Sequence, residues 1–440
     1  MLGHFTPAVL VIATSRHFEV AVLVLGLLMV AGALRSGYPR AALVPAPALF
    51  VAAGFALGPG ATGVVHFEPR SGFVAELAIV ALIVILFRDG LEVEGEMLQA
   101  HWHLPLRKLV LAMPLTAGVV ALAARVLVGL SWTEACLLGA LLSPTDPVLS
   151  SSVVTNPRVP RLIRHSLNLE SGLNDGLALP AVLALAAALQ IGGGHFVWWR
   201  FVLEDVSIGF AAGLFVGLVA ARLMPPGRGL AAEVPGHQKS LYALGSAFAA
   251  YGLAVLAPHG NGLIAVFVAA ITLGIRRPDL RAHFARQAID IVELVKLGVF
   301  AVFGSLLTLH GLFQDGVAAV AIVAITLLVA RPVGVFSALA GSQTDLATRG
   351  FMAWFGPKGV ATMTFSLLVL SEGIRAGSRI FNIAALTVVC SVILHGLTDG
   401  PGAEWIAARH AARHAEGPES ESRETRELSG GDVQSAKARP

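Results

Sequence analysis

Charged residues are scarce in this chain of 440 residues, in which Asp, Glu, Lys and Arg together make up 13% of the sequence. Soluble globular proteins carry about 25%. Hydrophobic residues reach 55%, and the mean hydropathy is +0.75. There is too little polar surface to cover a soluble fold of this size, so a soluble globular protein is excluded.

Cysteine and the motifs of intramembrane enzymes are also sparse or missing. The chain has two cysteines, Cys136 and Cys390, and both lie inside apolar runs, which excludes a disulfide framework and a cysteine-rich metal site. There is no His-Glu-x-x-His motif, no Gly-x-Ser-x-Gly motif and no paired Asp motif of the intramembrane aspartyl type. We therefore predict no enzymatic activity, no resident metal and no cofactor.

Apolar runs dominate the sequence instead, and many are long enough to cross a hydrocarbon core as a helix, which takes roughly 17 to 25 residues. Dividing the runs at clusters of charge, Gly and Pro predicts roughly thirteen spans. We place them near 18–34, 41–57, 71–88, 106–129, 133–154, 163–190, 204–223, 240–257, 260–275, 288–308, 315–341, 349–371 and 381–397. The prediction is an all-α polytopic membrane protein.

The net charge of +3 comes from Lys and Arg in short loops between the spans, so it indicates orientation and not a nucleic-acid partner. Most of these residues fall on the side of the C-terminal tail, which predicts a multi-pass protein of the cell membrane with a cytoplasmic tail. We divide the chain into an N-terminal segment 1–17, a transmembrane domain 18–400 and a mostly disordered polar tail 401–440. The first run has no small-residue cleavage site, so no removable signal peptide is expected.

Two of the predicted spans contain residues that break helices. The fifth span includes Ser143-Pro144-Thr145-Asp146-Pro147. A proline inside a helix costs about 3 kcal/mol, and an Asp at the bilayer centre costs about 2.5 to 3.5 kcal/mol. The twelfth span includes Gly356-Pro357-Lys358-Gly359. We predict that both helices unwind there and that the buried Lys358 pairs with an anion, for which Glu170 is the candidate.

The sixth span carries the polar run Glu170-Ser171-Gly172-Leu173-Asn174-Asp175. Residues four apart share a helix face, so Glu170 lies next to Asn174 and Ser171 next to Asp175. The oxygen atoms of Ser171, Asn174 and Asp175 suit a partly dehydrated alkali cation, and the carboxylate also suits a proton. A purely structural polar network is the alternative.

The broken spans are each the fifth of their half if two six-helix repeats, about 18–190 and 240–397, flank a linker helix at about 204–223. A single linker span reverses the second half relative to the first. Crossed broken helices in such inverted repeats are typical of secondary transporters, where the half-helix ends point at an ion.

These motifs, over nearly all of positions 18–400, resemble those of the monovalent cation:proton antiporter-1 family, the sodium/proton exchangers. Phe87-Arg88-Asp89-Gly90-Leu91 resembles the family's Phe-x-x-Gly-Leu element, and Thr145-Asp146-Pro147 its unwound segment. The run 170–175 is similar to the ion-binding helix, and the segment 356–359 to the second crossing.

The resemblance implies that Asp175 binds cation and proton alternately and that Thr145 and Ser171 help to bind the cation. It implies that Asn174 and Asp146 organise the crossing. The family also pairs an acid with a basic residue of the later broken span, commonly Arg. In this sequence the corresponding pair is Glu170 and Lys358.

Five further charged residues in or at the ends of the spans have structural interpretations. We expect Glu293 and Lys296 to pair with each other, and Arg331 to cap backbone carbonyls or to meet an acid on a neighbouring span. Arg88 and Asp89 lie at the predicted cytoplasmic end of the third span, where solvation is the simpler expectation.

The expected function is antiport of an alkali cation, Na⁺ first with K⁺ or Li⁺ as alternatives, against H⁺. With Asp175 as the sole exchanging acid, the exchange is predicted to be electroneutral and to need no ATP. The family implies a homodimer in the lipid bilayer. A sodium-coupled symporter of an organic solute and a channel are the rival functions.

Overall fold

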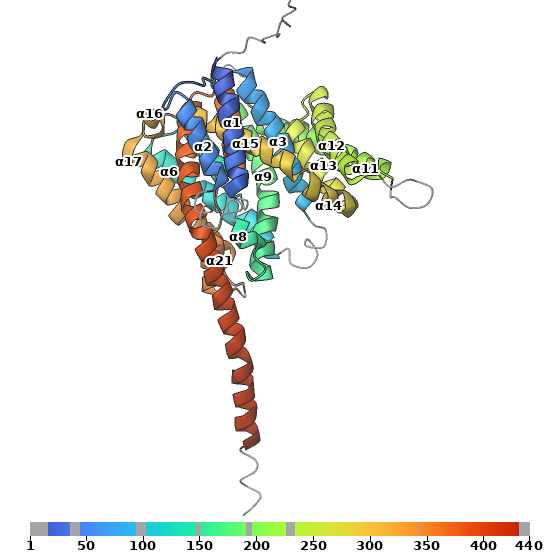
Figure 1. The fold of residues 1–440 in the computed structure, drawn as a ribbon, viewed down its shortest axis with the longest axis vertical. Coiled ribbons are helices and arrows are strands. Elements are labelled where there is room, and N and C mark those ends of the chain that lie inside the picture. The colour runs from blue at the N-terminus through green and yellow to red at the C-terminus, as the bar shows by residue number, and fades with distance from the viewer. Residues whose placement is uncertain are drawn as a thin grey trace, which may run out of the picture.

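The computed structural model describes residues 16–35, 45–93, 103–146, 151–190, 196–225, 234–342 and 344–430. Within these ranges the regular elements are helices, with short π-helical turns inside three of them, and there is no strand. Figure 1 shows a compact helical body from which the last helix, α21, projects as a long rod. The predicted all-helical fold class is confirmed.

The N-terminal part of the chain contributes the helices that carry most of the polar residues discussed below. They are α1 (Arg16–Arg35), α2 (Ala46–Leu57), α3 (Gly72–Glu92), α5 (His103–Arg107), η2 (Lys108–Ala112), α6 (Met113–Leu127), α7 (Trp132–Leu142), α8 (Ser151–Thr155) and α9 (Arg161–Leu189). The helical stretch that follows consists of α10 (Trp198–Arg200), η4 (Phe201–Val206) and α11 (Ser207–Leu223).

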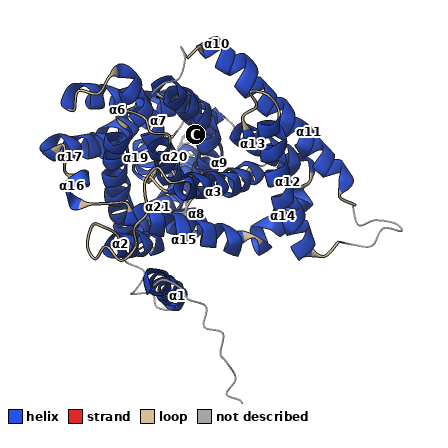
Figure 2. Cartoon of the chain, turned by 90° about the horizontal axis from the view of Figure 1, so that it is seen from above, coloured by secondary structure: helices blue, strands red, loops and turns tan. Residues whose placement is uncertain are grey.

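The C-terminal part of the chain also contains both long and short helices. It contains α12 (Gly236–Leu256), α13 (Gly262–Arg276), α14 (Pro278–Gln287), α15 (Ile289–Ser305), α16 (Leu309–Leu312), α17 (Gly316–Ile325), η5 (Thr326–Ala330), α18 (Arg331–Ala338), α19 (Leu346–Trp354), α20 (Val360–Ser371) and α21 (Gly377–Gly430). Figure 2 shows α11 to α14 on one side of α3 and α9, with α6, α16 and α17 on the other.

Each range predicted as a span contains a helix. Among the described residues, six helices are long and apolar enough to cross a membrane, and four more apolar helices are shorter. The shorter group includes α7 and α20. Each of them is one half of a span that the sequence predicts to be broken. An interrupted span therefore presents itself as two short helices, as expected when proline and charge prevent a continuous one.

Two elements differ from the sequence prediction. The helix α14, between α13 and α15, was not predicted because its polar sequence contains no apolar run. The region 401–440 was expected to be mostly disordered, but α21 continues through it as far as Gly430. That stretch is rich in Ala, Glu and Arg, which favour a helix even where there is no core to bury.

The helices α2 and α15 approach each other closely at two glycines, Gly54 and Gly304. On α2, a Cβ on Gly54 would lie 2.0 Å from the carbonyl oxygen of Ala301 on α15, and Gly304 faces Val51 in the same way at 2.1 Å. Figure 2 shows these two helices side by side. Close backbone approach through small residues is a common source of packing energy between helices in membranes.

We expect Gly54→Ala to lower the melting temperature of the purified protein in detergent. The added methyl group would force α2 away from α15, and overpacking of this kind costs about 1–3 kcal/mol. Gly252→Ala on α12 is the matched control, because a Cβ there meets no described atom within 4 Å. Equal melting temperatures for the two variants would contradict the packing described here.

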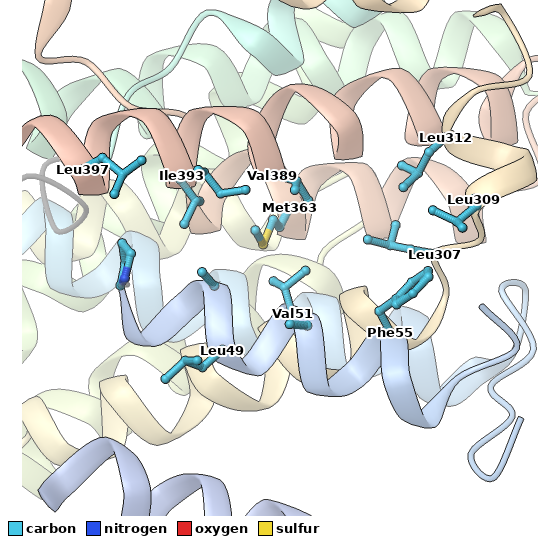
Figure 3. Close-up of a pocket in the computed structure, with 14 residues that line it drawn as sticks. Leu49, Val51, Phe55, Leu307, Leu309, Leu312, Met363, Val389, Ile393 and Leu397 are labelled. Atoms are coloured by element: carbon cyan, nitrogen blue, oxygen red, sulfur yellow. The ribbon is translucent and has the colours of Figure 1, made fainter. Parts of the chain in front are cut away.

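An apolar pocket of about 510 Å³ lies between α2 and α21. Its lining includes Leu49, Val51, Phe55, Met363 and Ile393, and Figure 3 shows these side chains converging on it. The lining has almost no polar atoms, so this pocket offers no ligands to a cation. The polar residues of the chain gather elsewhere, where α7, α9 and α20 meet.

Candidate functional site

Two interrupted helices meet at the centre of the helical body. The helix α7 ends at Leu142, and the break between α19 and α20 spans residues 355–359. The backbone N–H of Asp146 donates to the carbonyl oxygen of Pro357 at 2.8 Å, so the two extended segments touch. The prediction that both spans unwind is confirmed.

Charged side chains bond to the backbone groups that lack a partner within the helix at the ends of the half-helices. The Lys358 ammonium is completely buried and donates to the carbonyl oxygens of Ser143 at 3.2 Å and Pro144 at 3.0 Å, beyond the C-terminal end of α7. The Asp146 carboxylate accepts the backbone N–H of Val360 at 3.1 Å, at the first residue of α20. A cation at a helix C-terminus and an anion at an N-terminus each stabilise the helix dipole.

The long helix α9 is joined to the first broken segment through Asn174. The amide Nδ2 of Asn174 donates to both the carbonyl oxygen and the hydroxyl Oγ1 of Thr145, each at 2.9 Å. Only the NH₂ side of the amide can donate to a carbonyl, so this contact fixes the orientation of the group. The oxygen Oδ1 of Asn174 is therefore left facing away from Thr145.

Unpartnered oxygen atoms gather beside this contact. Asn174 Oδ1 and Asp175 Oδ1 are buried and have no hydrogen-bond partner among the described residues. Ser171, one turn earlier on α9, shares a cavity of about 10 Å³ with Thr145 and Pro357. That volume holds about one water-sized particle. Buried acceptors without donors are costly, and a partly dehydrated cation or a proton would satisfy them.

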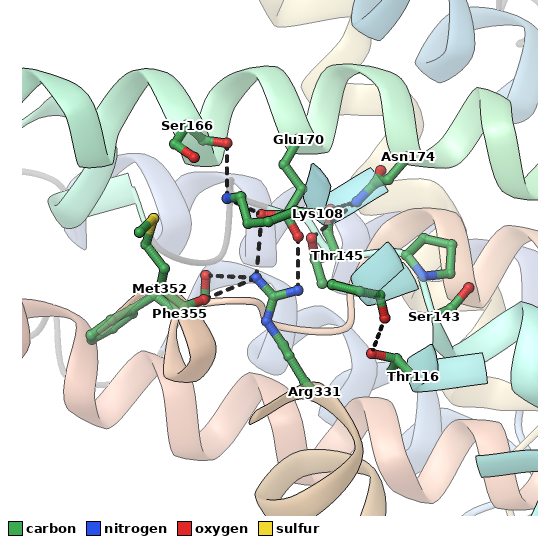
Figure 4. A network of polar contacts seen from close by, with 12 residues as sticks. Lys108, Thr116, Ser143, Thr145, Ser166, Glu170, Asn174, Arg331, Met352 and Phe355 are labelled. Atoms are coloured by element: carbon green, nitrogen blue, oxygen red, sulfur yellow. Dashed lines mark hydrogen bonds and ion pairs between the residues drawn. The ribbon is translucent and has the colours of Figure 1, made fainter. Parts of the chain in front are cut away.

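Glu170 does not form the predicted ion pair with Lys358. Its Oε2 lies 2.6 Å from Lys108 Nζ, and its Oε1 lies 2.9 Å from Arg331 Nη1 (Figure 4). All three side chains are buried. The prediction is wrong because the unwound segment 143–146 supplies free carbonyls to the Lys358 ammonium, whereas Glu170 faces η2 and the first residue of α18.

The partners of Glu170 are also tied to neighbouring backbone. Arg331 Nη2 donates to the carbonyl oxygen of Met352 at 3.1 Å, so this residue both caps a carbonyl and meets an acid, as expected. Lys108 donates to the carbonyl oxygen of Ser166 at 3.1 Å. In the sequence, Lys108 is one of the basic residues that flank the predicted spans. Its position at the start of an apolar run is the signal that it enters the helical body.

Arg88 and Asp89 lie in the last turns of α3. They are buried, whereas the sequence predicted that they would be solvated. They are only 7% and 2% exposed, and Arg88 Nε donates to Asp89 Oδ1 at 2.7 Å. The charges of Asp89, Asp146 and Arg88 all act on Asp175. The pair is buried because α3 packs against α9, α13 and α20. The predicted pair of Glu293 and Lys296 is confirmed at 2.6 Å.

The chain is similar to known proteins over most of its length. Residues 20–405 match the family model described as sodium/hydrogen exchanger, transmembrane. A K(+)/H(+) antiporter NhaP of Alkalimonas amylolytica is 25% identical over 361 residues, covering 79% of this chain and 60% of the relative. Na(+)/H(+) antiporter 2 of Zygosaccharomyces rouxii is 38% identical over 128 residues, covering 28% of this chain and 16% of that protein.

The chain spans about three fifths of the length of the bacterial relatives it matches. Among solved structures, the sodium proton antiporter MjNhaP1 from Methanocaldococcus jannaschii at pH 8 superposes with a TM-score of 0.74 at 18% identity. The match covers 89% of this chain and 99% of that one, which shows a shared fold. Since the family model covers most of the chain, this protein belongs to the transmembrane sodium/hydrogen exchanger family.

Proposed function

We propose that this protein is a secondary antiporter that exchanges a monovalent alkali cation for a proton across a membrane. The observation that carries the proposal is the pair of unpartnered buried oxygens, Asn174 Oδ1 and Asp175 Oδ1, beside the contact of two interrupted helices. Family membership supports it, since cation/proton exchange is the activity in the family's description and in the names of the relatives.

Competition at one carboxylate would couple the two ions. A proton on Asp175 removes the negative charge that a cation needs, and a bound cation removes the charge that a proton needs. Thr145 and Ser171 would complete the cation's oxygen shell, because both line the small cavity at the crossing. Asp146 and Asn174 would hold the crossing together, since Asp146 bonds across it to Val360 and Asn174 ties α9 to Thr145 of the first broken segment. Alternating exposure of this site to the two sides would complete a cycle that uses no ATP.

The proposed architecture is thirteen spans in two inverted repeats, with a homodimer in the cell membrane and the tail on the cytoplasmic side. The contact of the extended segment after α7 with the break before α20 supports the inverted repeats, which require two such segments to meet at the midplane. Na⁺ is the first candidate cation, with K⁺ and Li⁺ as alternatives. Relatives are named for both K⁺ and Na⁺, so the names alone do not choose between them.

A symporter of an organic solute is disfavoured by the size of the space at the crossing. The cavity lined by Thr145, Ser171 and Pro357 holds about 10 Å³, far less than an organic solute occupies. Small-molecule sites in proteins are usually about 300–1,000 Å³. The large pocket between α2 and α21 is apolar and offers no polar group that could orient such a solute.

The proposal is tested by reconstituting the full chain in vesicles that contain a pH-sensitive dye. NaCl, KCl, LiCl and choline chloride are added in turn, with the membrane voltage first free and then clamped by potassium and valinomycin. We expect the signal of the pH dye to recover with one or more alkali chlorides but not with choline chloride. The rate of this recovery should not depend on the voltage. A chain that shows no recovery with any alkali cation would refute the proposed function.

A further inference from the structure

A second acidic side chain lies beside Asp175. Asp89 on α3 packs against α9 next to Asp175: a Cβ on Gly172, three residues before Asp175, would lie 3.2 Å from the Asp89 carbonyl oxygen. The two carboxyl groups interact electrostatically. Asp146 also acts on Asp175, so two further carboxylates influence the proposed ion site. In an antiporter that exchanges one proton for one cation through one carboxylate, the other two carboxylates must be bonded to protein groups and take no part in the exchange.

Each of the other two carboxylates has a protein partner. Asp146 accepts the backbone N–H of Val360 and so belongs to the N-terminus of α20. Asp89 receives two donors of the same guanidinium, Nε and Nη2 of Arg88. Charge-assisted bonds from Arg to a carboxylate are among the strongest hydrogen bonds in proteins. Asp175 is the carboxylate that keeps a buried oxygen without a partner.

We propose that Arg88 is a positioning residue that holds Asp89 in a buried ion pair and thereby limits the exchanging site to a single carboxylate. The inference rests on the proposed antiport and adds the residue that sets its charge stoichiometry. Arg88 itself does not bind the transported ion. It acts through Asp89 by supplying a permanent positive charge that the ion would otherwise have to supply.

Glu92 and Lys296, two charged neighbours of Arg88, do not replace it. Glu92 approaches its Nε at 4.0 Å, but the Glu92 side chain is 52% exposed and so is screened by water. Lys296 is also close and carries the same sign, yet its ammonium is bonded to Glu293 at 2.6 Å. If Arg88 lost its charge, Asp89 would therefore lose the cation that is bonded to it.

Arg88 also borders a small cavity beside its ion pair with Asp89. This cavity of about 60 Å³ is lined by Arg88, Glu92 and Arg281. The guanidinium lies between this cavity and the Asp89 carboxylate to which it is bonded, so a shorter neutral side chain at position 88 would enlarge the space beside Asp89 for water or a small cation. The site would then contain two carboxylates free to exchange, and each transport cycle would move net charge.

The test compares Arg88→Gln, Arg88→Lys and the double variant Arg88→Gln with Asp89→Asn in the vesicle assay. We expect Arg88→Gln to exchange at a rate that changes several-fold between clamped voltages of opposite sign. Arg88→Lys keeps the charge and should remain independent of voltage. The double variant has one free carboxylate again and should also regain voltage independence. A purely structural role for Arg88 would reduce the rate without producing this pattern.

Voltage-independent exchange by Arg88→Gln would overturn the proposal while leaving the proposed antiport intact, because the parent protein is measured in the same vesicles. If Arg88→Gln does not yield folded protein, Asp89→Asn decides. That variant leaves the guanidinium unpaired beside Asp175, where it competes with the cation, so the KM for the alkali cation should rise at least several-fold while the maximal rate changes less. An unchanged KM in Asp89→Asn would also overturn the proposal.

Discussion

Asp175→Asn is expected to reduce cation/proton exchange to the background of empty vesicles while the protein still folds. The amide has the shape of the carboxylate but can carry neither the proton nor the negative charge that attracts the cation. Asp175 is 3% exposed, and its Oδ1 has no partner among the described residues, so no described donor loses its acceptor there. The measurement is dye recovery in vesicles that contain equal amounts of protein.

Asp279→Asn is the matched control for this variant. It makes the same chemical change in α14, where the Asp279 side chain is 45% exposed and pairs with Arg277 away from the crossing. We expect the control to exchange at close to the parent rate. Exchange by Asp175→Asn at a rate comparable to that of the control would remove Asp175 from the mechanism.

Glu170→Gln should be strongly destabilising. The carboxylate compensates Lys108 at 2.6 Å and Arg331 at 2.9 Å, and all three side chains are buried. Removing one partner of a buried ion pair costs about 3–5 kcal/mol, because the other charge stays buried without compensation. In this case two cations lose their shared anion. The melting temperature in detergent should fall well below that of the parent protein.

Ser166→Ala provides the control on the same helix face. The Ser166 hydroxyl is buried and without a partner in the described structure, and Lys108 bonds to the backbone carbonyl of Ser166 and not to its side chain. Its removal should leave the melting temperature nearly unchanged. If Glu170→Gln were as stable as Ser166→Ala, the three-residue ion cluster would contribute no net stability.

The positions of the spans and of their interruptions could be predicted from sequence because their causes are local. An apolar run of sufficient length forms a helix in lipid, where backbone groups must bond within the segment. Pro144 and Pro357 each remove a backbone N–H donor from such a helix. Both interruptions can therefore be predicted from the sequence alone. The oxygen-rich run 170–175 was recognisable in the same way, since polar atoms at that depth are costly.

Which charges meet was decided only when the helices packed. Glu170 is 62 residues from Lys108 and 161 from Arg331. Contacts over such separations leave no periodic pattern in the sequence. Lys358 was assigned to Glu170 on chemical grounds, yet the unwound carbonyls of Ser143 and Pro144 lie nearer to its ammonium. Arg88 and Asp89 follow an apolar run that could equally have ended in water, and the packing of α3 against α9, α13 and α20 buries them. Helix formation depends on neighbours along the chain, whereas the pairing of buried charges depends on which helix faces are brought together in space.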